Sequence, residues 1–141
     1  MKILLAADGS DFTRRAARYL AAHVAWFAKP PEVHVLHVHA PMPYRGTPPK
    51  ESAGPVHAYQ KDESEKALAV AQAALAEGHV AHTSSWAVGD PGKEIFAWCA
   101  ANGVDLILMG SHGHGALRTM AMGSVADQVL RASTVPVLIV K

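Results

Sequence analysis

The stretch from residue 104 to residue 124, VDLILMGSHGHGALRTMAMGS, joins an apolar run to a glycine-rich segment. The run Val104–Met109 is apolar except for Asp105, which is typical of a strand buried on both faces of a sheet. A helical pattern then extends from Ser124 to Ala132 and precedes a last apolar strand, Val135–Val140. Because a helix separates these two strands, they cannot pair as a hairpin, and we expect them to be parallel.

The same alternation of short apolar runs and helical patterns fills the rest of the chain. Further strands are predicted at Ile3–Ala7, Val33–Val38 and Val80–Val88, the last being weaker because serine and threonine interrupt it. Helices are predicted from Asp11 to the residues before Lys29-Pro30-Pro31, from about Tyr59 to Gly78, and from Pro91, with Asp90 as N-cap. This order predicts an α/β fold, a doubly wound parallel sheet of five strands with helices on both faces.

Length and proline content bear on the domain organisation. The 141 residues are enough for one domain with a sizeable core, and we predict a single domain over residues 1–141. Residues 40–57 contain five of the nine prolines and follow no regular period. A segment of this kind predicts a flexible loop.

Composition excludes several classes of protein. Thirteen basic and twelve acidic residues give a net charge of +1, which leaves no basic excess for a nucleic-acid partner. The one cysteine, Cys99, cannot form an internal disulfide. The run Ile3–Ala7 is too short for a signal peptide, and no segment reaches the roughly 18 apolar residues of a membrane-spanning helix. We therefore expect a cytoplasmic protein that binds neither nucleic acid nor membrane.

The glycine-rich segment is the first candidate for a binding site. In doubly wound sheets ligands bind at the carboxyl ends of the strands where the strand order reverses, which here means just after Ala7, Val38 and Met109. Glycine lets main-chain N–H groups approach a ligand closely, because it has no Cβ. Ser124-Val125-Ala126-Asp127 fits a capping box, and a helix N-terminus favours phosphate. Taken alone, the glycines favour a role in turning the chain, and it is their position after the strand that flanks the crevice that favours a binding site.

The spacing Gly110-x2-Gly113-x9-Gly123-Ser124 resembles the nucleotide-binding motif of the universal stress protein family, in its ATP-binding branch. The resemblance covers nearly the whole chain outside the proline-rich loop; it extends to Ala7–Ser10, Leu36–Val38, Val88–Pro91, Asp105–Gly110 and Val135–Val140. It implies a Rossmann-like fold of the adenine nucleotide alpha hydrolase type with strand order 3-2-1-4-5.

The resemblance also implies a function and a site. It implies an ATP-binding regulatory module of the stress response, with or without Mg²⁺ or Mn²⁺, that forms a homodimer through Val135–Val140. Asp8 would take the ribose hydroxyls or a nearby polar group, and Val38 would meet adenine through its backbone. No catalytic residue is predicted, and a slow metal-dependent ATPase of the same fold is the alternative. The expected binding residues are Ala7, Asp8, Val38, Met109, Gly110, His112, Gly113, His114, Gly123, Ser124 and Val125.

One departure from the family's pattern concerns histidine. The position after Gly113 is often arginine in the family and is His114 here, so phosphate affinity is expected to depend on pH through His112 or His114. These two histidines, together with His37 and His39, would reach the same end of the sheet, which raises a transition-metal site as an alternative. A role in hydrogen bonding to the backbone is favoured over metal binding. Histidines at strand ends commonly form such bonds, and no cysteine or carboxylate nearby completes a ligand set.

Overall fold

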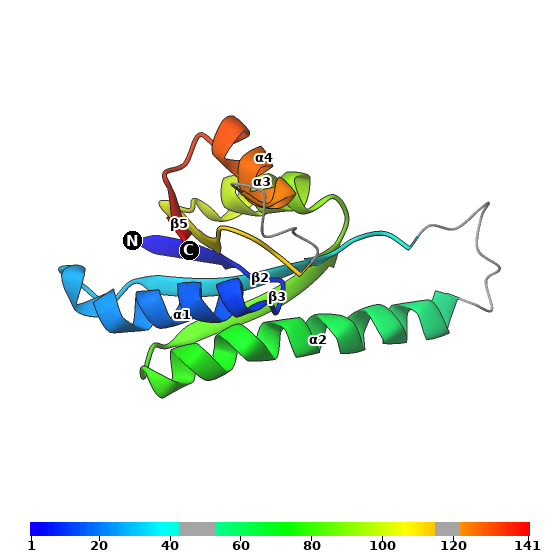
Figure 1. The fold of residues 1–141 in the computed structure, drawn as a ribbon, viewed down its shortest axis with the longest axis horizontal. Helices are drawn as coiled ribbons and strands as arrows, with labels where there is room; N and C mark the ends of the chain where they lie inside the picture. The colour runs from blue at the N-terminus through cyan, green and yellow to red at the C-terminus, as the bar shows by residue number, and fades with distance from the viewer. Residues whose placement is uncertain (43–52, 115–121) are drawn as a thin grey trace.

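The computed structural model describes residues 1–42, 53–114 and 122–141. Five strands form one parallel sheet in the order β3-β2-β1-β4-β5, which confirms the predicted topology (Figure 1). The strands are β1 (Lys2–Ala6), β2 (Glu32–His39), β3 (His82–Val88), β4 (Leu106–Gly110) and β5 (Val137–Val140). The chain therefore leaves β1 for β2 on one side and pairs β1 with β4 on the other, which places the reversal of strand order at β1.

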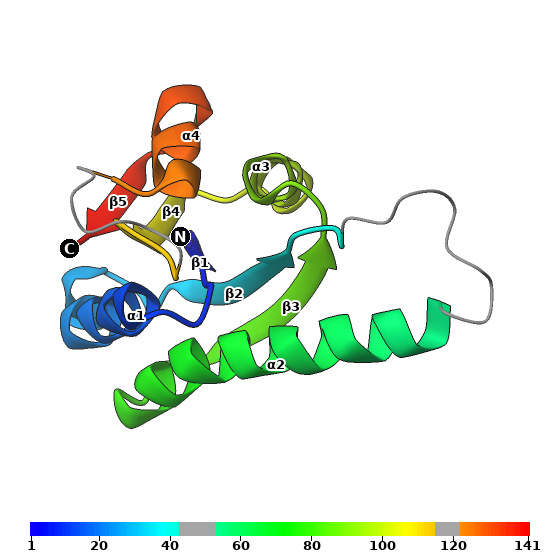
Figure 2. The ribbon, with the colours of Figure 1, turned by 45° about the vertical axis from the view of Figure 1, so that its right-hand side comes forward.

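The helices cover both faces of the sheet, as Figure 2 shows. They are α1 (Asp11–His23), the short 3₁₀ helix η1 (Val24–Trp26), α2 (Ala53–Glu77), α3 (Pro91–Asn102) and α4 (Ser124–Ala132). Successive residues of a strand point to opposite faces. Accordingly, Ile3 and Leu5 pack under α1 and α2, whereas Leu4 packs under α3 and α4. Each half of the core is thus supplied by alternate residues of the same strands.

Local signals explain where several elements begin and end. The side chain of Asp90 accepts a hydrogen bond from the Lys93 N–H (3.0 Å), so Asp90 caps α3 and Pro91 takes its first position, as predicted. Gly103 ends the same helix in the left-handed conformation (φ 63°), which glycine adopts without strain. Ser10 caps α1 through a bond from the Thr13 N–H (3.3 Å).

Several predicted boundaries were wrong, and β3 and β4 begin at His82 and Leu106, two residues later than predicted. Helix α2 begins at Ala53 and not near Tyr59, so the predicted loop extended too far along the chain. Pro55 lies in the first turn, where the backbone N–H has no partner within the helix, and proline is therefore tolerated there. The rest of that predicted loop, from residue 43 to residue 52, lies outside the described residues. At the other end of the chain β5 starts at Val137, two residues later than predicted.

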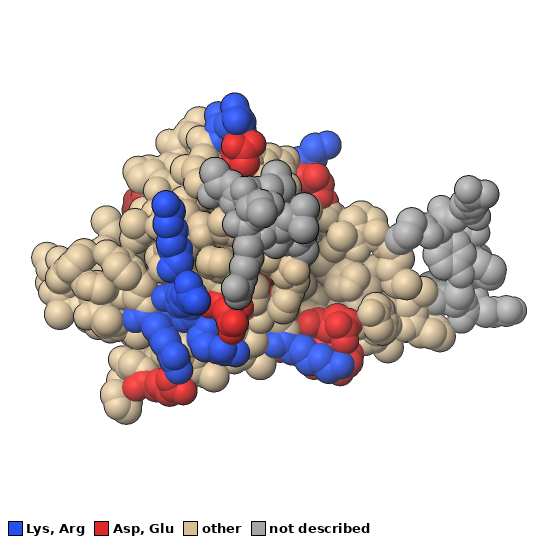
Figure 3. Space-filling view, in the orientation of Figure 1, with Lys and Arg blue, Asp and Glu red and all other residues tan. Residues whose placement is uncertain are grey.

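Surface charge is mixed on the face drawn in Figure 3, where acidic side chains accompany the lysines and arginines. Ion pairs join Arg14 to Asp11 (2.7 Å) and Arg18 to Glu77 (3.5 Å), and Lys66 contacts Asp62 (2.7 Å). Within the described parts of the chain, no helix combines the length and hydropathy needed to span a bilayer. Cys99 is buried, and burial raises the pKa of its thiol to about 11.

Candidate functional site

A pocket of about 380 Å³ opens at the carboxyl ends of β1 and β4, where the strand order reverses. Parallel pairing sets Ala6 opposite both Leu36 and Met109, so β1 and β4 end at nearly the same level, while β2 extends further, to His39. The volume falls within the roughly 300–1,000 Å³ typical of small-molecule sites. The position agrees with the expectation that ligands bind beyond the strand ends at such a reversal.

All eleven residues that the sequence singled out for binding line this pocket. They are Ala7, Asp8, Val38, Met109, Gly110, His112, Gly113, His114, Gly123, Ser124 and Val125. Sequence reasoning missed six further lining residues: Ala6, Thr13, Leu36, Pro91, Ile95 and Ala126. Ala6, Ile95 and Ala126 are apolar residues with no distinctive motif, and Leu36 and Pro91 lie in stretches that carry the family resemblance. Thr13 has a polar side chain and a specific contact.

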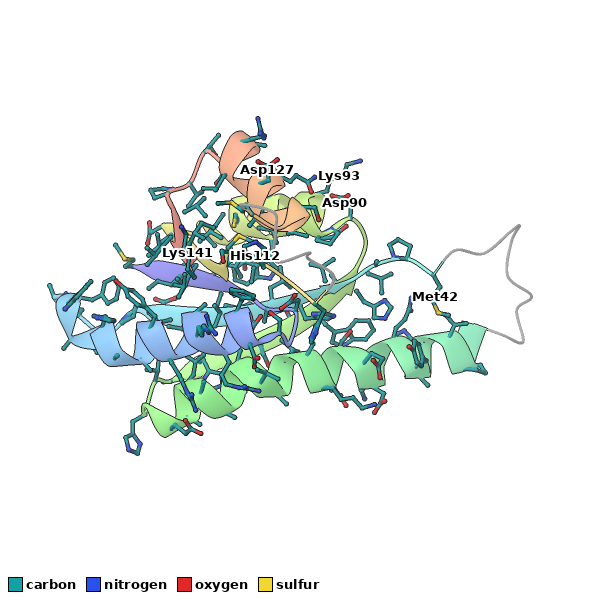
Figure 4. All side chains as sticks on the ribbon, viewed as in Figure 1. Met42, Asp90, Lys93, His112, Asp127 and Lys141 are labelled. Carbon is teal, nitrogen blue, oxygen red and sulfur yellow. The ribbon has the colours of Figure 1, made fainter. Side chains whose placement is uncertain are left out.

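The pocket has an apolar wall and a wall rich in main-chain polar groups. Leu36 and Val38 from β2, with Pro91 and Ile95 from α3, form the apolar wall. The segment after β4 and the first turn of α4 form the other. A side-chain bond from Gln128 Nε2, in the middle of α4, to Asp90 Oδ1 (3.2 Å) joins α4 to the N-cap of α3, where Figure 4 labels Asp90. Such a pocket suits a ligand with a flat apolar part and a polar part.

Both oxygens of the Asp8 carboxylate accept hydrogen bonds from the protein. Its Oδ1 accepts hydrogen bonds from the Ser10 N–H (3.0 Å) and the Thr13 hydroxyl (2.7 Å), and its Oδ2 accepts one from the His114 N–H (3.1 Å). Burial by itself would raise the pKa of Asp8, but these hydrogen bonds outweigh it and hold the pKa below its usual value. Asp8 is therefore an ionised group in the pocket wall at neutral pH.

The glycines of the segment are required by close contacts within the protein. A Cβ on Gly110 would lie 2.6 Å from the Phe12 Cβ and 2.8 Å from the Phe12 carbonyl carbon, and a Cβ on Gly113 would overlap Asp8 Oδ2. A Cβ on Gly123 would lie 3.1 Å from the His112 Cα. That these glycines also let main-chain N–H groups approach a ligand stays a prediction. Within the protein, the missing side chains have an effect of their own. They make room for α1, for a carboxylate and for the loop itself.

The predicted capping box at Ser124 was wrong. Gly123 is the N-cap of α4, with extended backbone (φ −71°, ψ 154°), and Ser124 is the first helical residue. The Asp127 side chain does not reach back, because it binds the Arg131 Nε (2.8 Å and 3.0 Å). Among the described residues no side chain caps α4. The N–H groups of its first turn therefore remain available to an external acceptor at the pocket wall.

The histidines at this end of the sheet bond mainly to neighbouring groups of the chain. His37 donates from Nδ1 to the Ala7 carbonyl (2.8 Å), and His39 donates to the Ala40 carbonyl (2.7 Å). His112, labelled in Figure 4, pairs with the Ser111 hydroxyl (2.9 Å). Burial lowers the pKa of His37, although its bond to Ala7 opposes this. In residues 1–42, 53–114 and 122–141, no three His, Cys, Asp or Glu side chains gather as a metal site, so the metal alternative gains no support.

Comparison with known proteins identifies relatives along the entire chain. The sequence profile described as "Universal stress protein family" matches residues 1–141. "Universal stress protein YxiE" of Bacillus subtilis is 33% identical over 147 residues, a match that covers 99% of this chain and 98% of that protein.

Solved structures with the same fold include proteins with bound nucleotides. One, described as a universal stress protein in complex with cAMP, has a TM-score of 0.70 at 20% identity, with 100% of this chain and 97% of that chain covered. Another, from Arabidopsis thaliana and described as having AMP bound, has a TM-score of 0.68 at 17% identity, with 100% and 91% covered. At these identities the likeness establishes the fold alone.

Proposed function

Because the chain belongs to the universal stress protein family, we propose that it is a regulatory protein of the stress response that binds an adenine nucleotide, ATP in particular. One observation carries the proposal. The pocket at the strand-order reversal joins an apolar wall to the uncapped N-terminus of α4. Relatives with bound cAMP and AMP support the choice of an adenine nucleotide.

Each wall of the pocket matches one part of ATP. In this proposal the adenine ring lies against Leu36 and Ile95, and the main chain of Val38 meets its edge. The phosphates lie at the first turn of α4, where the N–H groups and the positive end of the helix dipole favour an anion. A carboxylate oxygen accepts more than one hydrogen bond, so a ribose hydroxyl could still donate to Asp8 Oδ2. Mg²⁺ or Mn²⁺, if present, would accompany the phosphates.

Calorimetric titration of the purified protein with ATP tests the proposal. We expect one ATP per chain, and mass spectrometry of material released by denaturation should identify ATP or ADP. Failure to bind ATP, or release of a flavin nucleotide, would rule the proposal out. Incubation of the complex with Mg²⁺ or Mn²⁺ separates regulatory binding from the alternative, a slow metal-dependent ATPase, because only the ATPase releases phosphate.

We further propose that the protein is a homodimer that pairs through β5. This strand is at one edge of the sheet (Figure 2), and Leu138 on it is 36% exposed. An apolar edge strand readily pairs with a second chain. Leu138→Lys should therefore convert a dimer into a monomer at micromolar concentration, as measured by light scattering. Val88→Lys, on the opposite edge strand β3, is the matched control and should leave the dimer intact; a monomeric parent protein would contradict the proposal.

Because protonated histidine beside the phosphates strengthens binding, the affinity for ATP is expected to decrease as pH rises from about 5.5 to about 8. His112 and His114 line the pocket, and an imidazolium near the phosphates attracts them, whereas neutral imidazole does not. The expected change is about two- to five-fold in Kd, in line with a single partly exposed charge pair. His114→Ala should reduce the slope, and His79→Asn, at the C-terminal end of α2, is the control. A flat profile in the parent protein would refute the dependence.

A further inference from the structure

Asp8 joins three segments that are far apart along the chain. Its Oδ1 holds the turn after β1 and the first turn of α1, through Ser10 and Thr13. Its Oδ2 accepts the main-chain N–H of His114, 106 positions away, in the segment that follows β4. One carboxylate thus ties the glycine-rich segment to the rigid start of α1.

Thr13 fixes the direction of that carboxylate. The side chain is 2% exposed, and its hydroxyl accepts the Asp8 N–H (3.0 Å) while it donates to Asp8 Oδ1 (2.7 Å). A threonine bonded to both the main chain and the side chain of the same residue leaves that residue little rotational freedom. Oδ2 is therefore held toward the His114 N–H.

Gly113 is part of the same contact. Any Cβ at this position would overlap Asp8 Oδ2, so the segment can approach the carboxylate only with glycine there. The segment is rich in glycine, and an untethered glycine segment loses much conformational entropy when it becomes ordered around a ligand. The hydrogen bond from the His114 N–H to Asp8 Oδ2, which we call the tether, exists before the ligand arrives and so reduces that loss.

The tether also separates two openings of the surface. The pocket of about 380 Å³ and a neighbouring, more open cleft of about 440 Å³ share Asp8, Val38 and His114 as lining residues. The bond between Asp8 and His114 therefore lies in their common wall. If it breaks, the wall of the nucleotide pocket is lost on that side.

We propose that Asp8, supported by Thr13, is a positioning residue that fixes residues 111–114, which directly follow β4, in their ligand-binding shape through the His114 N–H. The inference rests on the proposed nucleotide binding and assigns to Asp8 a role independent of contact with the ribose. It also assigns Thr13 a part in binding that its sequence position does not suggest.

Asp8→Asn tests the tether with almost no change of shape. The amide oxygen can still accept the bonds from Ser10 and Thr13, but the amide nitrogen then faces the His114 N–H, and two donors cannot bond. We expect the Kd for ATP to rise about ten-fold, the size expected for a lost hydrogen bond to a charged group. Loss of a negative charge near the phosphates would by itself strengthen binding, so simple electrostatics predicts the opposite sign. Asp11→Asn, an exposed carboxylate on α1, is the charge-matched control and should bind normally.

Two further measurements separate positioning from other roles. With 2′,3′-dideoxy-ATP, which lacks both ribose hydroxyls, Asp8→Asn should cause the same ten-fold loss; if the loss disappears, Asp8 acts as a direct ribose ligand and the inference is wrong. In the ligand-free protein, NMR hydrogen exchange of the His114 amide should become faster in Asp8→Asn and stay unchanged in Asp11→Asn. Unchanged exchange in Asp8→Asn would also overturn the inference.

Thr13 variants provide an independent check. Thr13→Val has nearly the same volume and lacks the hydroxyl, so it should accelerate His114 exchange and weaken ATP binding, whereas Thr13→Ser should restore both. Equal behaviour of the two variants would exclude the role of the hydroxyl. If the parent protein binds no adenine nucleotide at all, the proposed function fails and with it the effect on affinity. The exchange data, which need no ligand, would still decide whether the tether exists.

Discussion

Gly110→Ala is expected to lower the free energy of unfolding by about 2–3 kcal/mol, the upper range for overpacking in a core. The added methyl would lie 2.6 Å from the Phe12 Cβ and 2.8 Å from the Phe12 carbonyl carbon. Both sides of β4 are paired, with β1 and with β5, so the strand cannot move aside. Helix α1 would have to shift instead, and it packs on the same core as β1 and α2.

Urea unfolding followed by circular dichroism measures this effect. Gly54→Ala is the matched control: a Cβ on Gly54 has no atom within 4 Å, so alanine at this helical position should not lower stability and should raise it slightly. Phe12→Ala should not rescue Gly110→Ala, since the clash involves the Cβ and backbone that alanine retains. Equal stability of Gly110→Ala and Gly54→Ala would show that α1 and β4 are not in close contact at this point.

The fold follows from the sequence because its signals are local and repeated. Apolar runs such as Ile3–Ala7 and Val33–Val38 alternate with helical patterns, and a right-handed crossover then leaves few arrangements of a parallel sheet. The start of α2 was missed because Pro55 is a strong signal against helix in general and a weak one in the first turn. A single sequence does not reveal whether a proline stands in the first turn of a helix or in the loop before it.

The candidate site was predictable in its members and not in its contacts. A motif names Gly110, Gly113 and Gly123, but it does not say which atoms fill the space that each leaves. Those atoms come from Phe12, Asp8 and His112, and only the packing of α1 against the segment after β4 brings the first two there. Thr13 was missed for the same reason. In the sequence, only its place in the first turn of α1, five residues after Asp8, connects Thr13 with the site.

The largest effect on ligand binding is expected from Gly123→Val, with a Kd for ATP about 100-fold higher. Valine can adopt the backbone conformation of Gly123 (φ −71°, ψ 154°), so no backbone strain arises there. Its Cβ would, however, lie 3.1 Å from the His112 Cα and 3.5 Å from the Gly113 nitrogen, and its two methyl groups would extend further. The Gly123 N–H also donates to the Ser111 carbonyl (2.8 Å), which holds the segment after β4 against the start of α4.

Gly123→Val therefore separates the two parts of the site that would enclose the phosphates. An overpacking energy of up to about 3 kcal/mol, taken up by the binding site, corresponds to roughly a 100-fold change in Kd. Calorimetric titration with ATP measures it, and a thermal melt shows whether the variant stays folded. Gly123→Ala is the graded control: its single methyl requires a shift of only a few tenths of an ångström, so its loss of affinity should be much smaller. Parent-like affinity in Gly123→Val, with the fold intact, would mean that the phosphates do not lie between this segment and α4.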